Sequence, residues 1–189
     1  MFIRTERLFL RPGWPEDMDA FLQAMGGDPV ARNIGVSELP HSADEMRDYL
    51  ERPRAGLLQH FFVHLRDSLG APLVGGVGLG HSGDEQADGE LELGYWIARE
   101  HRGHGYAAEA VRAVLAQARM LGHQRVVASR FARSRASVRV LERSGFRATA
   151  GARQAQGIPL GAESDKSRYV AELADKLGDR LGLASARHA

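Results

Sequence analysis

The sequence predicts a single α/β (α+β) domain in which helices flank a mixed, largely antiparallel, twisted sheet of about six to seven strands. Short segments in which polar and apolar residues alternate, bounded by glycine and proline, indicate the strands. Between them lie longer segments whose apolar residues recur at helical spacing. The 189 residues, of which 43% are hydrophobic and 26% charged, are enough for one sizeable core, and no linker-like segment divides them.

The first half of the chain supplies strands and helices in alternation. The first strand spans residues 2–11, where apolar and polar side chains alternate until a Pro-Gly pair ends the run. One helix begins at Trp14, with a proline and two acids in its first turn, and another begins at a capping box that starts with Ser42. Residues 61–66 and 72–80 predict a hairpin whose second strand is rich in glycine. Such a bare strand allows a ligand or another backbone to approach closely, although weak edge packing explains it equally well.

The middle of the chain combines a strand, a glycine-rich turn and a helix. Residues 90–97 alternate and end in aromatic and branched residues, which is typical of a strand. Residues 107–121 place apolar side chains on one helical face, and Gly122 ends this helix. The remaining predicted elements are a strand at 125–130, a helix at 134–144 with Ser134 as its N-cap, a strand that starts at Phe146 and a last strand at 167–173. We expect the domain to cover residues 1–173, and residues 174–189 to form a tail that begins as a short amphipathic helix and then frays.

The turn between that strand and helix has the sequence Arg102-Gly103-His104-Gly105-Tyr106-Ala107. The N–H groups of a helix's first turn and the positive end of its macrodipole can hold a phosphate. Glycine lets the backbone approach closely and adopt positive φ, and Arg102 adds a positive charge. A plain glycine turn is the alternative, but the strand before it and the helix after it favour a phosphate-binding loop, the cradle (residues 102–107). It is neither a Walker loop nor a dinucleotide fingerprint, because no Gly-Lys-Ser/Thr and no third glycine follow.

Composition excludes several kinds of protein. A net charge of +1 gives no bulk electrostatic attraction for nucleic acid or for a membrane surface. The absence of cysteine removes disulfides, thiolate metal sites and a cysteine nucleophile, and it fits a reducing compartment. The start of the chain is no signal peptide, no apolar run approaches about 18 residues, and the histidines have no carboxylate or cysteine at ligand spacing. We therefore expect a cytoplasmic protein with no metal and no membrane contact.

Five separated segments resemble, in the right order, the RimJ/RimL-like branch of the GNAT superfamily of acetyl-CoA-dependent N-acetyltransferases. They are residues 5–12 (TERLFLRP), 28–35 (DPVARNIG), 92–97 (ELGYWI), 102–107 (RGHGYA) and 137–146 (SVRVLERSGF). The resemblance covers roughly residues 2–173 and implies a GNAT-like domain that uses acetyl-CoA as co-substrate, with the cradle on its pyrophosphate. One position departs from the pattern, because Ser134 stands where the family usually has asparagine. Serine still caps a helix, but its shorter reach affects a contact made to the pantetheine arm.

Acetyl transfer to an amine requires a neutral amine, donors for the oxyanion and stabilisation of the departing thiolate. The resemblance implies that Glu92 is the general base, with Glu90 as the second choice, and that Ser137 hydrogen-bonds or protonates the sulfur. A solvated or salt-bridged strand glutamate and an ordinary serine in the first turn of a helix are the alternatives. Strand alternation puts Glu92 on the face opposite its apolar neighbours. The residues expected to bind the coenzyme are the backbone of Tyr95, Trp96 and Ile97, the cradle residues Arg102, Gly103, His104, Gly105, Tyr106 and Ala107, and the hydroxyls of Ser134 and Ser137.

We expect an acetyltransferase that acts by direct attack in a ternary complex, since an acetyl-cysteine intermediate is impossible without cysteine. The expected acceptor is the α-amine of a peptide or amino-acid-like molecule, because few acids can be placed near the site and the glycine-rich strand leaves room for a peptide. A polyamine or aminoglycoside remains an alternative through the acidic loop at 81–89, as does a non-catalytic acyl-CoA-binding or sensing module. Nucleic acid is not expected as a partner, and the protein is a monomer or a homodimer.

Overall fold

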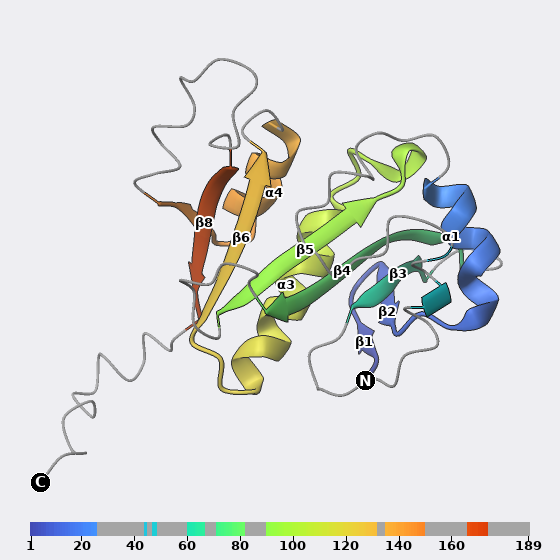
Figure 1. Ribbon diagram of the computed structural model, residues 1–189, viewed down its shortest axis with the longest axis horizontal. Coiled ribbons are helices and arrows are strands. Elements are labelled where there is room, and N and C mark those ends of the chain that lie inside the picture. Colours follow the sequence, from blue (N-terminus) through green and yellow to red (C-terminus); the bar gives the residue numbers. More distant parts are fainter. Residues whose placement is uncertain are drawn as a thin grey trace, which may run out of the picture.

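The computed structural model describes residues 1–25, 44, 47–48, 60–66, 71–81, 90–131, 135–149 and 166–173. Within these residues eight strands form one sheet in the order β1-β2-β3-β4-β5-β6-β8-β7 (Figure 1). The strands are β1 (Ile3–Arg4), β2 (Leu8–Arg11), β3 (Phe61–Leu65), β4 (Leu73–His81), β5 (Leu91–Ile97), β6 (Arg125–Phe131), β7 (Arg147–Ala148) and β8 (Lys166–Glu172). The helices are η1 (Pro15–Asp17), α1 (Met18–Met25), η3 (Arg99–His101), α3 (Tyr106–Met120) and α4 (Arg135–Arg143).

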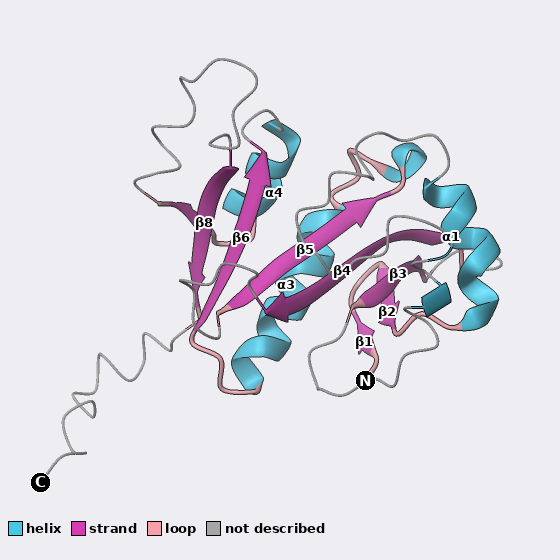
Figure 2. Cartoon of the chain, viewed as in Figure 1, coloured by secondary structure: helices cyan, strands magenta, loops and turns pink. Residues whose placement is uncertain are grey.

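The sheet is mixed, because β5 and β6 run parallel whereas its other neighbouring strands pair antiparallel. Helices flank it, as the cyan and magenta elements of Figure 2 show. The predicted class of fold is therefore confirmed, with eight strands within the described residues where about six to seven were expected. Two of these strands, β1 and β7, are only two residues long.

Two apolar clusters occupy opposite faces of the sheet, because successive strand residues point to opposite sides. Phe61 and Val63 of β3 belong to the larger cluster, which includes Val111 of α3. Phe62, between them, stacks on Phe21 of α1 in the smaller cluster, with ring centroids 6.1 Å apart. The helices α3 and α1 therefore cover opposite faces.

The first predicted strand is wrong in its length. The structure divides residues 2–11 into β1 and β2, joined by a turn in which the Thr5 N–H donates to the Leu8 carbonyl oxygen at 2.9 Å. A physical reason for the break is that Thr5 and Arg7 bind Glu109 of α3, which a continuous strand would not allow. The two glycine stops are confirmed, since Gly122 and Gly145 have φ values of 88° and 92° after α3 and α4.

Several expectations lie outside the described residues. They are the segment at 28–35, most of the helix that begins at Ser42, the acidic loop beyond His81, the N-cap Ser134 and the tail at 174–189. Among the helices that are described, none is long and apolar enough to cross a membrane.

Candidate active site

Strand β5 pairs differently along its two edges. Against β4 it runs antiparallel from Gly75↔Ile97 to His81↔Leu91. Against β6 it runs parallel with the registered pairs Leu91↔Val126 and Glu92↔Val127. Figure 1 shows the consequence, in which β5 and β6 start together and diverge toward their C-terminal ends. Along the C-terminal half of β5, the edge that faces β6 is therefore separated from β6.

The direction of the backbone groups on β5 follows from the ladder. The Ala98 N–H donates to the Val74 carbonyl oxygen at 2.9 Å, so the backbone of Trp96, two residues earlier, also faces β4. The alternate residues Tyr95 and Ile97 then direct their backbone groups toward β6. Trp96 therefore departs from the expectation that its backbone lies on the coenzyme side. Its position in the sheet makes it a partner of β4.

The cradle follows β5 and η3 and leads into α3. Gly103 and Gly105 have φ values of 82° and 81°, the left-handed region that glycine adopts without strain. Gly105 is the N-cap of α3, and the N–H groups of Tyr106 and Ala107 in its first turn have no acceptor within the helix. Two left-handed glycines beside such amides fit a diphosphate. In the part of the chain that the structure describes, no group of three or more metal-ligating side chains is found.

Two contacts fix the cradle from within. The Arg102 Nε–H donates to the Ile97 carbonyl oxygen at 3.0 Å, so this side chain links the cradle to the β6-facing edge of β5. The rings of His104 and Tyr106 stack with centroids 5.4 Å apart and planes 12° apart. The cradle is exposed from Arg102 to Gly105 and half-buried at Tyr106 and Ala107, so it lies at the surface.

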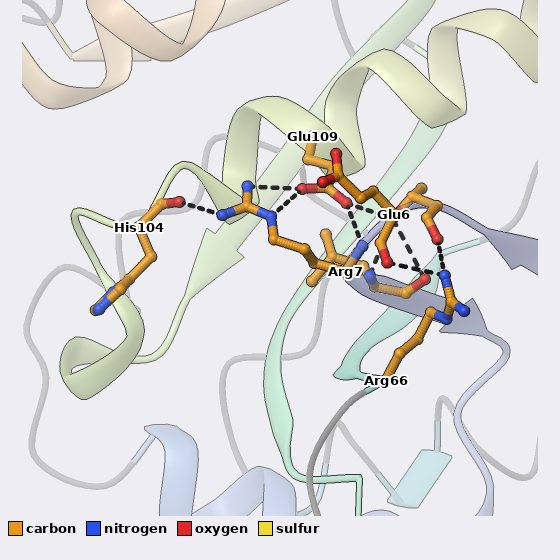
Figure 3. Close-up of polar contacts among 7 residues, drawn as sticks. Glu6, Arg7, Arg66, His104 and Glu109 are labelled. Atoms are coloured by element: carbon orange, nitrogen blue, oxygen red, sulfur yellow. Dashed lines mark hydrogen bonds and ion pairs between the residues drawn. The ribbon is translucent and has the colours of Figure 1, made fainter.

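A third set of contacts ties the cradle to the N-terminal turn, and Figure 3 shows it. The Glu109 carboxylate accepts hydrogen bonds from the Thr5 hydroxyl (2.6 Å), the Arg7 backbone N–H (2.9 Å) and the Arg7 Nε–H (2.8 Å). The Arg7 Nη1–H donates to the His104 carbonyl oxygen at 3.0 Å. Burial alone would raise the pKa of Glu109, but the hydrogen bonds from Thr5 and Arg7 and the Arg7 charge hold it below its ordinary value. Sequence reasoning missed this network, although a glutamate four residues after the N-cap glycine was a signal.

The proposed base, Glu92, lies on the β5 face expected for it. Leu91 and Leu93 on either side belong to the core cluster under α3. Trp96, four residues on and so on the same face as Glu92, meets Phe21 of α1 edge to face at 5.8 Å. Glu92 itself is 8% exposed, so the alternative of a solvated surface glutamate does not apply.

Glu90, the second choice as base, is ion-paired with two arginines. Its carboxylate lies 3.2 Å from Arg125 Nη1 and accepts a hydrogen bond from Arg168 Nη2. Both oxygens of this carboxylate are therefore engaged by guanidinium groups. The two glutamates therefore differ in environment, and only Glu92 lies within β5 itself.

Ser137 and Tyr95 are brought together, although they come from different elements. Ser137 lies in the first turn of α4, and its carbonyl oxygen accepts a hydrogen bond from the Tyr95 hydroxyl at 3.3 Å. This contact holds α4 beside the C-terminal half of β5. Both side chains are half-buried. The fold thus places the serine expected to meet the sulfur beside the strand expected to bind the pantetheine arm.

The glycines of β4 do not leave room for a peptide, which corrects that interpretation. A Cβ at Gly75 would overlap the Trp96 carbonyl oxygen, and one at Gly76 would overlap the Trp96 indole nitrogen. A Cβ at Gly78 would overlap the ring of His60, whose burial lowers its pKa to about 4. In addition, β4 is paired on both edges, with β3 and with β5, so it cannot accept an added strand.

Comparison with known families and structures agrees with this arrangement. The family model of the acetyltransferase (GNAT) domain matches residues 7–147. The chain therefore belongs to the GNAT acetyltransferases and is an acyltransferase enzyme, and the members of this family use acetyl-CoA. A search of curated proteins found no match.

Solved structures share the fold at low identity. A GNAT-family acetyltransferase from Bacillus anthracis is similar with a TM-score of 0.68 and 22% identity, over 93% of this chain and 100% of that one. RimL, a ribosomal L7/L12 α-N-protein acetyltransferase in complex with coenzyme A, has a TM-score of 0.67 and 16% identity, over 91% and 98%. A chimera of the Vibrio cholerae spermidine N-acetyltransferase SpeG and hSSAT has a TM-score of 0.63 and 19% identity, over 88% and 95%.

Proposed function

We propose that this enzyme is a RimJ/RimL-like N-acetyltransferase that transfers the acetyl group of acetyl-CoA to the α-amine of a peptide, protein N-terminus or amino-acid-like molecule. The observation that carries this proposal is the divergence of β5 and β6 beside a cradle with two left-handed glycines. An extended pantetheine arm fits along the open edge of β5, and its diphosphate fits the N-terminus of α3. The site thus suits a coenzyme with a long arm and a charged end.

The reaction follows from the groups on and beside β5. The neutral amine nitrogen attacks the thioester carbonyl, which forms the new C–N bond and places negative charge on the carbonyl oxygen. That oxygen requires a donor, and the backbone N–H of Ile97 lies on the edge of β5 directed toward β6. Collapse breaks the C–S bond, and the Ser137 hydroxyl donates to the departing thiolate sulfur. Glu92, five residues before Ile97 and so about 16 Å from it along β5, accepts through a chain of waters the proton that the amine loses.

The choice between Glu92 and Glu90 rests on their partners. Glu90 is ion-paired with Arg125 and Arg168, so its carboxylate oxygens are already engaged by two guanidinium groups. Glu92 is buried on the face that α1 covers, where a carboxylate is shielded from water. We therefore assign the base to Glu92.

The choice of acceptor rests on charge. A polyamine or aminoglycoside is a polycation, and its site normally gathers several carboxylates. Of the two acids at β5, Glu90 is already neutralised by arginine, which leaves Glu92 to serve a single amine. An α-amine with a pKa near ~8 loses its proton far more readily than a lysine amine near ~10.4, so one carboxylate suffices for it. The related RimL acts on a protein α-amine and the related SpeG chimera on spermidine, so both classes occur on this fold.

The deciding measurement compares kcat/KM for short peptides, amino acids, spermidine and an aminoglycoside, with acetyl-CoA as donor and release of free thiol as the readout. We expect the α-amine acceptors to be used best and acetyl-CoA to bind at micromolar levels by calorimetry. Polycations used at least about tenfold better than peptides, equal to about 1.4 kcal/mol in transition-state binding, would overturn the choice of acceptor. Thiol release with none of the acceptors, together with no binding of acetyl-CoA, would overturn the function itself.

A further inference from the structure

We propose that Arg7, from the turn between β1 and β2, is a positioning residue of the coenzyme site, which sets the shape and charge of the cradle. This inference rests on the proposed function, because it assigns a role toward the coenzyme diphosphate. The contacts of Arg7 lie 97 and 102 residues away in sequence, at His104 and Glu109. No motif in the sequence joins these segments, and only the fold brings them together (Figure 3).

The first part of the role is geometric. Arg7 donates through Nη1 to the His104 carbonyl oxygen, which lies between the two left-handed glycines. Its guanidinium carbon lies 4.9 Å from the centroid of the Tyr106 ring, on the other side of Gly105. A Cβ built at Gly105 would come within 3.6 Å of Arg7 Nη2, so the guanidinium is directly beside the N-cap. Arg7 therefore holds both residues that flank Gly105.

The second part is electrostatic. Glu109 is 9% exposed and lies one turn inside α3, where its backbone N–H makes a 3.2 Å bond to the Gly105 carbonyl oxygen. A carboxylate so close to the helix N-terminus would repel a bound diphosphate. Arg7 Nη2 lies 2.7 Å from the Glu109 carboxylate and compensates its charge.

The turn that carries Arg7 is itself held in place. Arg66 donates to the carbonyl oxygens of Glu6, at 2.8 Å, and of Thr5 (Figure 3). The Thr5 hydroxyl in turn donates to Glu109 at 2.6 Å. A fixed turn of this kind gives Arg7 little freedom, so its guanidinium can serve as a rigid support for the cradle.

A purely structural role for Arg7 is the competing explanation, since the pair also joins the N-terminal strands to α3. The chain offers a matched control. Arg11 of β2 makes an equally close bidentate pair with buried Asp17, with distances of 2.6 and 2.7 Å, away from the cradle. Loss of either pair should lower the melting temperature, but only loss of the Arg7 pair should change coenzyme binding.

The experiment measures the Kd of coenzyme A by calorimetry, and the KM values of acetyl-CoA and of S-acetylpantetheine, a donor without the diphosphate. We expect Arg7→Ala to raise the Kd of coenzyme A at least about tenfold, with little change in the KM of S-acetylpantetheine. The double variant Arg7→Ala/Glu109→Gln should recover part of this loss, because it removes the uncompensated carboxylate. Arg11→Ala should lower the melting temperature without changing the Kd of coenzyme A.

Arg7→Lys replaces Arg7→Ala as the test variant if Arg7→Ala does not fold. Lysine keeps the positive charge but lacks the planar guanidinium that contacts both Glu109 and His104. We expect it to raise the Kd of coenzyme A by about threefold or more. Wild-type affinity in the variant that folds, or equal losses for acetyl-CoA and S-acetylpantetheine, would overturn the role of Arg7. A wild-type protein that binds no coenzyme A would instead overturn the proposed function and this inference with it.

Discussion

The two edges of β5 differ in how far they are paired with neighbouring strands. Toward β4 the strand pairs along its whole length, from Gly75↔Ile97 to His81↔Leu91, and toward β6 its registered pairs are Leu91↔Val126 and Glu92↔Val127. The glycines differ in the same way. Those of β4 make room for side chains of the protein itself, whereas those of the cradle adopt positive φ at the surface. One edge of β5 therefore holds the sheet together, and the other is the edge that we propose for the coenzyme.

The largest effect is expected on stability, from a substitution in β4, the strand that pairs with β5 along its whole length. Gly78→Val would drive a branched side chain into the His60 ring and backbone between fully paired strands. We expect the free energy of unfolding to fall by about 3 kcal/mol or more, as measured by urea denaturation. A variant as stable as the wild type would show that β4 is not the close-packed support inferred here.

The second prediction concerns the chemistry at β5. Glu92→Gln keeps the shape of the side chain but removes the proton acceptor, so kcat at neutral pH should fall about 100-fold. The loss should shrink at high pH, where more of the amine is already neutral. Glu90→Gln is the matched control, and its kcat should change far less because Glu90 is paired with arginine. A wild-type kcat for Glu92→Gln at pH 7 would remove Glu92 from the mechanism.

The third prediction concerns the cradle. Gly105→Val places a branched residue at a φ of 81°, which strains the backbone and shifts the N-cap of α3. We expect the Kd of coenzyme A to rise about 30-fold, or roughly 2 kcal/mol, by calorimetry. Gly122→Ala has a similar φ of 88° at the other end of α3 and controls for strain alone. Equal loss of affinity in both variants would contradict a specific role for the cradle.

The smallest expected effect is the dependence of the free energy of unfolding on pH, which arises from His60 beside β4. Burial lowers the pKa of His60 to about 4, against an ordinary value of 6.5, so the unfolded chain binds more protons than the folded chain between these values. His60 therefore lowers the free energy of unfolding as pH falls, by roughly 1 to 2 kcal/mol between pH 7 and pH 5. Denaturation of the wild type and of His60→Phe at both pH values tests this. An identical pH dependence in the two proteins would contradict it.

Local patterns in the sequence predicted much of the fold. The alternation at residues 90–97, the helical spacing after the cradle and the stops at Gly122 and Gly145 depend on neighbours in the chain, and the structure shows all of them. The cradle itself was predicted because its glycines lie between a strand and a helix. The roles assigned to Glu92 and Ser137 stay predictions, since their positions fit those roles without testing them.

Features that depend on distant residues were not predictable in this way. The first strand breaks at Thr5 and Arg7 because of Glu109, about a hundred residues away. The glycines of β4 are required by two residues that pack against them, His60 just before β3 and Trp96 of β5. A single sequence does not record which of these residues meet, because the sheet topology decides it.

The most direct test of the different roles of the two β5 edges is amide hydrogen exchange, measured by NMR with and without coenzyme A. We expect coenzyme A to slow exchange at Ile97 and in the cradle, at Gly105 and Tyr106. The amide of Trp96, which faces β4, should exchange slowly in both states and change little. Protection by coenzyme A of the β4-facing amides, with none at Ile97 or in the cradle, would contradict the assignment of the two edges of β5.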